Sequence, residues 1–154
     1  MNPNMDLGMM KRHFTLVLKK NKIMPAYHSK QTGEGMPEAC SCSLVPIKTE
    51  VRGPAAQAPA GQDDIIDDVL NFFRANVLFR NFDIRGGVDR TLIYLTLFTC
   101  LCLVKCEKIE DKPTAVRELR TLAEKKFTIP GEASWPLGGL FSGVSLSIQY
   151  PLHR

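Results

Sequence analysis

The stretch Thr91–Val104, TLIYLTLFTCLCLV, is an uninterrupted run without a charged side chain, and it lies between Arg90 and Lys105. A membrane-spanning helix needs about 20 consecutive apolar residues, so this run is too short to cross a bilayer. Its position in the middle of the chain excludes a secretory signal. A helix that is apolar on every side is usually packed on every side. We therefore expect it to be the central helix of a small helical domain, covered by the other elements.

The composition is typical of a soluble globular protein. The 154 residues are 44% hydrophobic and 23% charged, which is sufficient for one domain with a buried core. The net charge of +4 comes from residues 1–23, which carry five basic side chains and one acidic, whereas charges balance over residues 24–154. The body of the chain has no clustered basic helix and no RNA-binding signature, which argues against nucleic-acid binding.

Three segments are predicted to be helices, over residues 63–80, 88–108 and 113–126. The second contains the central apolar run and follows the pair Gly86–Gly87, which breaks the chain before it. The third begins at Pro113, a residue favoured in the first turn of a helix. Its inner face is expected to consist of Val116, Leu119, Leu122 and Ala123.

The helix predicted over 63–80 has the clearest signals. Its apolar side chains recur at intervals of three and four residues, which predicts one buried stripe formed by Ile65, Ile66, Val69, Leu70, Phe73 and Val77. Carboxylates fill its first two turns, at Asp63, Asp64, Asp67 and Asp68. Acid–base chemistry or a metal is the alternative use of such carboxylates. We favour a structural role, because negative charge at this end complements the helix dipole and no histidine is nearby in the sequence.

The remaining segments are less regular. Residues 24–62 are rich in Pro and Gly and are expected to lie extended across the helices. The loop 127–141 is expected to be anchored by Trp135. The last residues alternate apolar and polar side chains, a strand-like pattern carried by Val144, Leu146, Ile148 and Tyr150.

Residues 1–23 differ in composition from the rest, and two interpretations are open. They are either a basic targeting or membrane-surface arm, or a disordered, dispensable leader ahead of a start at Met24. We favour the leader, because chain ends without packing partners are usually disordered. The expected organisation is thus an extension over 1–23, a domain over 24–141 and a divergent tail over 142–154.

The five cysteines are expected to be free thiols in a reducing cytosolic environment. The pairs Cys40/Cys42 and Cys100/Cys102 are too closely spaced for the usual structural zinc site. The three histidines, His13, His28 and His153, form no recognisable catalytic pattern. We therefore predict no catalytic residue, no cofactor and no metal, and a small metal or redox protein remains the alternative that the cysteines leave open.

Nine blocks of sequence occur in the order and spacing of one known family. They are Met24–Ser29, Leu44–Lys48, Arg52–Pro54, Asp64–Asp68, Phe72–Val77, Phe79–Ile84, Asp89–Tyr94, Ile129–Glu132 and Trp135–Leu137. In these blocks the chain resembles subunit 3 of the actin-related protein 2/3 complex. The family usually has different residues at Asp68, Leu78 and Trp135, and these departures are mild.

The resemblance implies a non-catalytic, all-helical subunit of a complex that nucleates branched actin filaments. The implied partners are the other subunits, chiefly the larger actin-related protein, and the mother filament. The implied location is the cytoplasm and the cytoskeleton, without nucleic-acid binding or membrane insertion. The alternative is a stand-alone helical adaptor that no longer docks into the complex.

The family continues with a further long helix, which GVSLSIQYPLHR at residues 143–154 replaces. The predicted fold class is therefore all-α, with one central apolar helix covered by the others and the C-terminal helix of the family missing. Without that helix, part of the apolar surface of the domain should stay exposed. Along the central helix itself, we expect Leu92, Leu95 and Cys102 to be nearly inaccessible to solvent.

Six residues are candidates for contact with partners: Tyr27, His28, Arg74, Asn76, Arg80 and Asn81. The last four are polar positions near the end of the first predicted helix and are expected to be exposed. Arginine and asparagine at such positions also serve as helix caps and as partners of the helix dipole, so a structural role is the alternative.

Overall fold

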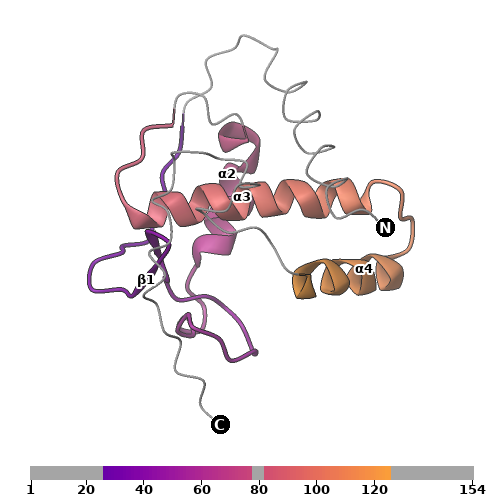
Figure 1. Cartoon of the computed structure of the whole chain (residues 1–154), viewed down its shortest axis with the longest axis horizontal. Helices are drawn as coiled ribbons and strands as arrows, with labels where there is room; N and C mark the ends of the chain where they lie inside the picture. Colours follow the sequence, from indigo (N-terminus) through magenta and orange to yellow (C-terminus); the bar gives the residue numbers. More distant parts are fainter. Residues whose placement is uncertain (1–25, 78–81, 126–154) are drawn as a thin grey trace.

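The computed structural model describes residues 26–77 and 82–125, which contain three helices and one small antiparallel sheet. The element order is β1 (Glu38–Ala39), β2 (Cys42–Ser43), α2 (Ile65–Asn76), α3 (Gly87–Cys106) and α4 (Lys112–Glu124). The long helix α3 runs through the middle, α2 crosses it, and α4 folds back beside its far end (Figure 1). The fold is thus organised around α3, as the apolar run predicted.

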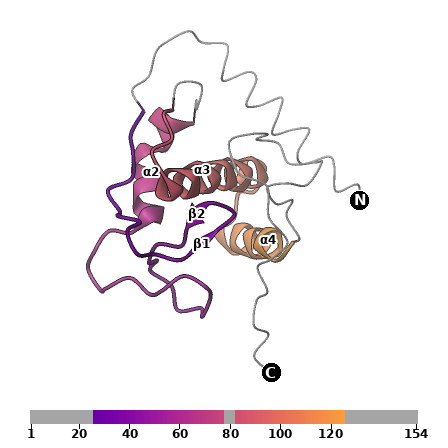
Figure 2. The same ribbon diagram turned by 60° about the vertical axis from the view of Figure 1, so that its left-hand side comes forward.

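Each helix falls on its predicted segment, although α2 ends at Asn76 and not at residue 80. The expectation of an all-α fold is wrong in one detail. Residues 38–43 form an antiparallel hairpin in which Ala39 pairs with Cys42. Its two turn residues, Cys40 and Ser41, have φ of 53° and 63°, the left-handed conformation that a tight type I′ turn requires at both positions. The hairpin lies close to the first turns of α3 (Figure 2).

Helix α2 begins at a capping box. The Asp64 carboxylate accepts hydrogen bonds from the backbone N–H groups of Ile66 (2.9 Å) and Asp67 (3.1 Å). In return, the Asp67 carboxylate accepts from the backbone N–H of Asp64 at 2.8 Å. These bonds satisfy donors that every helix start leaves unpaired. The aspartates at this helix start therefore have the structural role that the sequence predicted.

The first turn of α3 fits closely against β2. A side chain at Gly87 would collide with the Ser43 side chain and lie 3.0 Å from the Ser43 backbone nitrogen, so only glycine allows this approach. One turn later, the Thr91 hydroxyl donates to the Ser43 carbonyl oxygen at 2.8 Å. The glycine that the sequence marked as a break therefore also brings the hairpin onto the helix.

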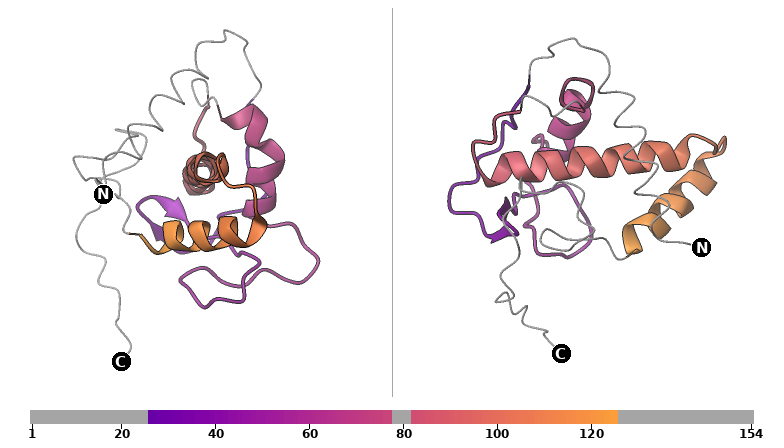
Figure 3. Two further views of the ribbon diagram at one scale, coloured as in Figure 1. Left: turned by 90° about the vertical axis from the view of Figure 1, so that its right-hand side faces the viewer. Right: turned by 45° about the horizontal axis from the view of Figure 1, so that its top comes forward.

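Helix α4 starts at Asp111, whose side chain accepts a hydrogen bond from the Thr114 backbone N–H at 2.8 Å, with Pro113 in the first turn. The bond to Thr114 holds the pKa of the Asp111 carboxyl below its usual value. Of the predicted inner face of this helix, only Leu122 is buried, and Val116 is 41% exposed. Viewed along α3, helices α2 and α4 lie on different sides of it (Figure 3).

Two apolar clusters form the core. One consists of Val45, Ile65, Val69 and Leu92, and it joins the 24–62 segment, α2 and α3. The other consists of Ile93 and Leu97, packed against Phe82, Ile84, Tyr94 and Cys42. Leu92 has no exposed surface, which confirms its predicted burial.

The expectation that α3 is covered along its whole length is wrong. Leu95 and Cys102 are half-buried rather than inaccessible, and Leu103 is 54% exposed. The reason is the placement of the neighbours. Helix α2 and the hairpin cover the beginning of α3, whereas α4 alone of the described elements runs beside its end, joined to it by the ion pair of Lys105 with Glu118 at 3.1 Å.

Helix α3 is longer than the uncharged run, since it includes Gly87–Arg90 and Lys105–Cys106. By length and composition alone it could therefore cross a membrane, a test that the core helix of a soluble protein also passes. Two observations favour a core helix: α2 packs on its side, and Asp89 in its first turn is buried and paired with His28.

Several expectations concern residues outside those that the structure describes. They are the disordered leader over 1–23, the loop 127–141 with Trp135, the strand-like tail over 142–154 and the missing C-terminal helix.

Candidate interaction surface

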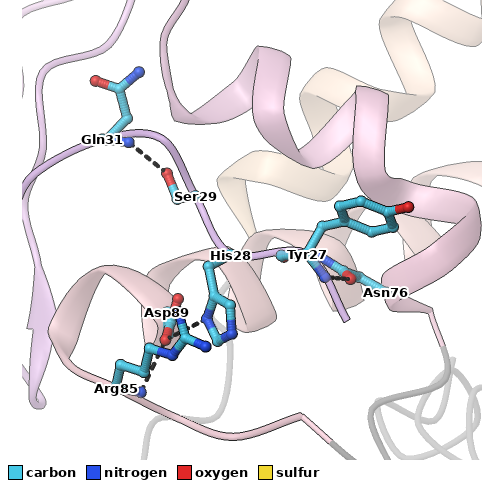
Figure 4. A network of polar contacts seen from close by, with 7 residues as sticks. All are labelled: Tyr27, His28, Ser29, Gln31, Asn76, Arg85 and Asp89. Carbon is cyan, nitrogen blue, oxygen red and sulfur yellow. Dashed lines mark hydrogen bonds and ion pairs between the residues drawn. The ribbon is translucent and has the colours of Figure 1, made fainter. Parts of the chain in front are cut away.

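Residues 26–31, which we call the strap, run along α2 from its last residue towards its first turn, and His28 reaches from the strap to the start of α3. The strap is fastened first by Asn76, at the last position of α2. The side-chain oxygen of Asn76 accepts from the Tyr27 backbone N–H at 2.9 Å, and its NH₂ group donates to the Tyr27 carbonyl oxygen at 2.6 Å (Figure 4). Asn76 is only 2% exposed, so its amide supports the strap in place of a strand partner.

The Tyr27 ring lies on α2. It stacks on Phe72 with ring centroids 5.3 Å apart and planes 14° from parallel, and the Lys30 ammonium lies 5.8 Å from the centre of the Phe72 ring. Tyr27 remains 45% exposed. The strap thus presents an aromatic side chain at the surface, and aromatic residues are enriched in protein interfaces.

His28 points away from Tyr27, towards the first turn of α3 (Figure 4). Its Nδ1 lies 2.9 Å from the Asp89 carboxylate, and the same carboxylate oxygen accepts from the Arg85 backbone N–H at 2.8 Å. The imidazole also packs against Phe82, with ring centroids 4.9 Å apart. The His28 side chain therefore holds the strap to α3 and leaves little of itself for a partner.

After these two attachments along the chain, Asp68 of α2 holds Ser29 and Lys30, in the middle of the strap. One of its oxygens, Oδ2, accepts from the Ser29 hydroxyl at 2.7 Å and from the Lys30 backbone N–H at 2.9 Å. Asp68 is completely buried, and its other oxygen, Oδ1, has no hydrogen-bond partner among the described residues. Three buried polar side chains thus fasten the strap to two helices, and at its end the Gln31 side-chain NH₂ group donates to the Asp63 carbonyl oxygen at 2.9 Å.

One side of α2 carries apolar residues that the fold leaves exposed. Ile66 is 38% exposed and Leu70 is 60% exposed, and Arg74 follows four residues later. Residues four apart share one side of a helix, so these three form the outer row of α2. The prediction that Ile66 and Leu70 are buried is wrong, because α3 covers only the side of α2 that carries Ile65 and Val69.

The six predicted contact residues therefore fall into four groups. Tyr27 and Arg74 are exposed, and His28 is half-buried in its pair with Asp89. Asn76 was expected to be exposed but is buried, because its side chain is needed inside the fold. Arg80 and Asn81 lie outside the described residues.

Sequence reasoning missed Ile66, Leu70 and Lys30 as surface candidates. The signal for the first two was the width of the apolar stripe on α2. Six apolar positions spread over almost half the circumference exceed what one neighbouring helix can cover. Lys30 carried no signal, since its position over Phe72 depends on residues 42 positions apart in the chain.

Three of the five cysteines, Cys42, Cys100 and Cys102, have thiols of low reactivity. Burial raises the pKa of the Cys42 and Cys100 thiols to about 11, and burial also raises the pKa of Cys102. These thiols are therefore protonated at neutral pH, whereas a reactive cysteine needs a lowered pKa. Within residues 26–77 and 82–125, no group of three or more His, Cys, Asp or Glu side chains could hold a metal ion.

Comparison with known proteins completes the description. Residues 24–149 match the family model described as P21-Arc, the ARP2/3 complex ARPC3 (21 kDa) subunit. Proteins named actin-related protein 2/3 complex subunit 3 are similar over most of the chain. The Schizosaccharomyces pombe protein is 45% identical over 120 residues, covering 77% of this chain and 68% of its own length. The Dictyostelium discoideum protein is 44% identical over 116 residues (74% and 66%), and the Arabidopsis thaliana protein 38% over 117 residues (75% and 67%).

Proposed function

The chain belongs to the ARPC3 subunit family of the ARP2/3 complex, and from this membership we infer that it acts as a structural, non-catalytic subunit of that complex. The observation that carries the inference is the match over residues 24–149, which includes all the described helices. The match spans about two thirds of the length of the relatives, so the role of the whole relatives is a proposal for this chain.

The distribution of apolar side chains supports this role. Leu70 on α2, Leu103 on α3 and Val116 on α4 are each more than 40% exposed, although all three lie on helices of the core. Of these, Leu70 lies beside the exposed Ile66 on α2, and adjacent exposed apolar residues are typical of a surface that a partner covers, whereas single ones are ordinary. A subunit without catalytic residues contributes through such surfaces.

We further propose the finer assignments implied by the family. The chain packs on the larger actin-related protein and contacts the mother filament, in the cytoplasm and at the cytoskeleton, without inserting into a membrane. For the partner contacts we propose Tyr27 and Arg74, which are exposed, together with Arg80 and Asn81. His28 and Asn76 contribute indirectly, by holding the strap that carries Tyr27.

Assembly tests the proposal. The full chain is co-expressed with the other subunits of the complex, and the mixture is separated by gel filtration. The variant Leu70→Asp places a charge in the outer row of α2, and the matched control Val51→Asp places one on a loop residue that is 76% exposed. We expect the unchanged chain and Val51→Asp to elute with the complex, and Leu70→Asp to elute alone.

Both substitutions change exposed side chains, so both variants should unfold at the temperature of the unchanged chain. If the unchanged chain itself elutes as a small species, the inferred role is wrong and the stand-alone adaptor accounts for the protein instead. If Leu70→Asp assembles normally, membership of the complex stands but Leu70 is not part of the contact with the other subunits.

The contact with the filament needs a separate test. Complexes assembled with Arg74→Glu are compared with unchanged complexes for co-sedimentation with preformed actin filaments at low and at physiological salt. We expect normal assembly with weaker sedimentation, because a reversed charge at the rim of an interface weakens attraction most at low salt. If variant and unchanged complexes sediment equally at each salt concentration, Arg74 is not part of the filament contact.

A further inference from the structure

The three buried side chains that fasten the strap, Asn76, Asp89 and Asp68, differ in how completely their polar atoms are paired. Asn76 uses both its oxygen and its NH₂ group on Tyr27, and the Asp89 carboxylate bonds His28 and the Arg85 backbone. Asp68 is different, because its Oδ1 is buried without a partner among the described residues. A buried carboxylate with one unpaired oxygen tolerates additional negative charge poorly.

Ser29 is the residue at which such a charge could be added. Its hydroxyl donates to Asp68 Oδ2 at 2.7 Å and accepts from the Gln31 backbone N–H at 3.1 Å. Ser29 is half-buried in an irregular segment whose neighbours Tyr27 and Lys30 are exposed. Short irregular segments of this kind open locally more easily than helices do, which gives an enzyme access to the hydroxyl.

We propose that the strap is a latch that a phosphoryl group on Ser29 opens. In the transfer, the Ser29 oxygen forms a bond to the terminal phosphorus of ATP, the bond from that phosphorus to the bridging oxygen of ADP breaks, and the hydroxyl proton leaves. The product has lost the hydrogen that Asp68 accepted. It also places a charge of about −1.5 to −2 beside a buried carboxylate, and this combination is disruptive.

The positive charge of Lys30 does not offset this effect in the closed strap. Its backbone N–H already donates to Asp68, and its ammonium group lies over the Phe72 ring. If Lys30 turned to the phosphate, it would leave the ring that the strap covers. Whether Lys30 stays over the Phe72 ring or turns to the phosphate, the strap is held less firmly at Ser29 and Lys30.

Opening the latch would change the surface of α2. The Phe72 ring, against which Tyr27 and Lys30 lie, would become more accessible, and the buried amide of Asn76 and carboxylate of Asp89 would be uncovered. The device therefore couples one modification on the strap to the exposure of an aromatic and polar surface across two helices. The inference concerns the isolated chain and does not depend on its assembly into the complex.

The test uses the full chain with phosphoserine incorporated at position 29, and amide hydrogen exchange of the strap measured by mass spectrometry. We expect exchange in residues 26–31 to be faster by about tenfold or more than in the unmodified chain. The control carries phosphoserine at position 32, since the Thr32 side chain is exposed and accepts only a long bond from the Glu34 N–H at 3.4 Å. This control should leave exchange in the strap unchanged.

A second arm tests the cause. In the Asp68→Asn variant the neutral amide does not repel the phosphate, so phosphoserine at position 29 should accelerate exchange much less than it does beside Asp68. Unchanged exchange after phosphorylation of the Asp68 chain would show that the strap accommodates the charge and would overturn the proposal. The proposal would also be overturned if phosphoserine at position 29 accelerated exchange equally in the Asp68 chain and in the Asp68→Asn variant. Repulsion by the buried carboxylate would then not be what opens the latch.

Discussion

The two halves of α3 have similar composition but different surroundings. In residues 87–97, the side chains of Asp89, Leu92, Ile93, Thr96 and Leu97 are buried. In residues 98–106 no side chain is buried, and Leu103 is more than half exposed. The first half has α2 on one side and the hairpin on another, whereas the second half has only α4 among the described elements (Figure 1).

The difference shows what an apolar run does and does not specify. The apolar run indicates that much apolar surface is available for burial. Because it has no polar positions, it has no periodicity to indicate which side of the helix is covered. Cover depends on where the neighbouring elements lie. We interpret the first half as the core of the domain and the second half as surface that the ARP2/3 complex partners can cover.

The largest expected effect on stability comes from making the same substitution, leucine to alanine, in each half of α3. Leu92→Ala should lower the free energy of unfolding by about 2–5 kcal/mol, because it leaves a cavity in a core position. Leu103→Ala should change it by about 0.5 kcal/mol or less, as exposed positions do. Urea denaturation of both variants makes the measurement. Similar losses at both positions would mean that the halves are equally packed.

The next effect concerns the strap that ties the end of α2 to the first half of α3. Asn76→Ala leaves the Tyr27 backbone N–H and carbonyl unpaired, so it should cost about 1–3 kcal/mol. Arg74→Ala, two residues earlier and exposed, should cost about 0.5 kcal/mol or less. Thermal unfolding distinguishes them. A loss at Arg74 as large as that at Asn76 would show that Arg74 has a structural role and is not primarily a contact residue.

A smaller effect is expected where the hairpin meets α3. Gly87→Ala introduces a methyl group against Ser43 and should cost about 0.5–2 kcal/mol, since overpacking is partly offset by the better helix propensity of alanine. The control Gly53→Ala has open space around it and should change stability little. Calorimetric unfolding of both variants tests this. No loss at Gly87 would mean that the hairpin moves away freely.

The smallest effect concerns acid. The hydrogen bond from Lys48 holds the pKa of the Asp67 carboxyl below its usual value. A carboxyl with a lowered pKa in the folded state adds stability above its unfolded pKa of about 3.9, and that stability is lost as pH falls through the lower, folded pKa. The melting temperature of Asp67→Asn should therefore fall less steeply below about pH 4 than that of the unchanged chain. If melting temperature falls equally steeply with pH in both chains, Asp67 does not contribute to the loss of stability in acid.

Local signals were sufficient to predict the helices. The aspartates before Ile65, the pair Gly86–Gly87 and the Asp111-Lys112-Pro113 turn mark helix starts through caps and backbone preferences that depend only on nearby residues. The hairpin was missed because Glu38–Ser43 contains no β-branched or aromatic residue and its turn is Cys40-Ser41 rather than the usual Asn-Gly.

The candidate surface was only partly predictable, for a different reason. Arg74 was correctly expected at the surface, and the candidate Tyr27 is exposed as well. The bonds of Asn76, Asp89 and Asp68 to the strap, however, join residues 38 to 61 positions apart. No periodicity within one segment carries such information. The burial of Asn76 is the clearest case. Its side chain is buried because the Tyr27 backbone lies beside it, and nothing in the sequence around Asn76 indicates that contact.

Hydrogen exchange along α3 tests the central claim, that one helix has a covered half and an uncovered half, most directly. In the full chain, amides of residues 90–97 should exchange only through global unfolding, whereas those of residues 99–106 should exchange by local opening, at rates about tenfold or more faster. Protection of the second half should rise on assembly with the other subunits. Equal, slow exchange along the whole helix in the isolated chain would contradict the account.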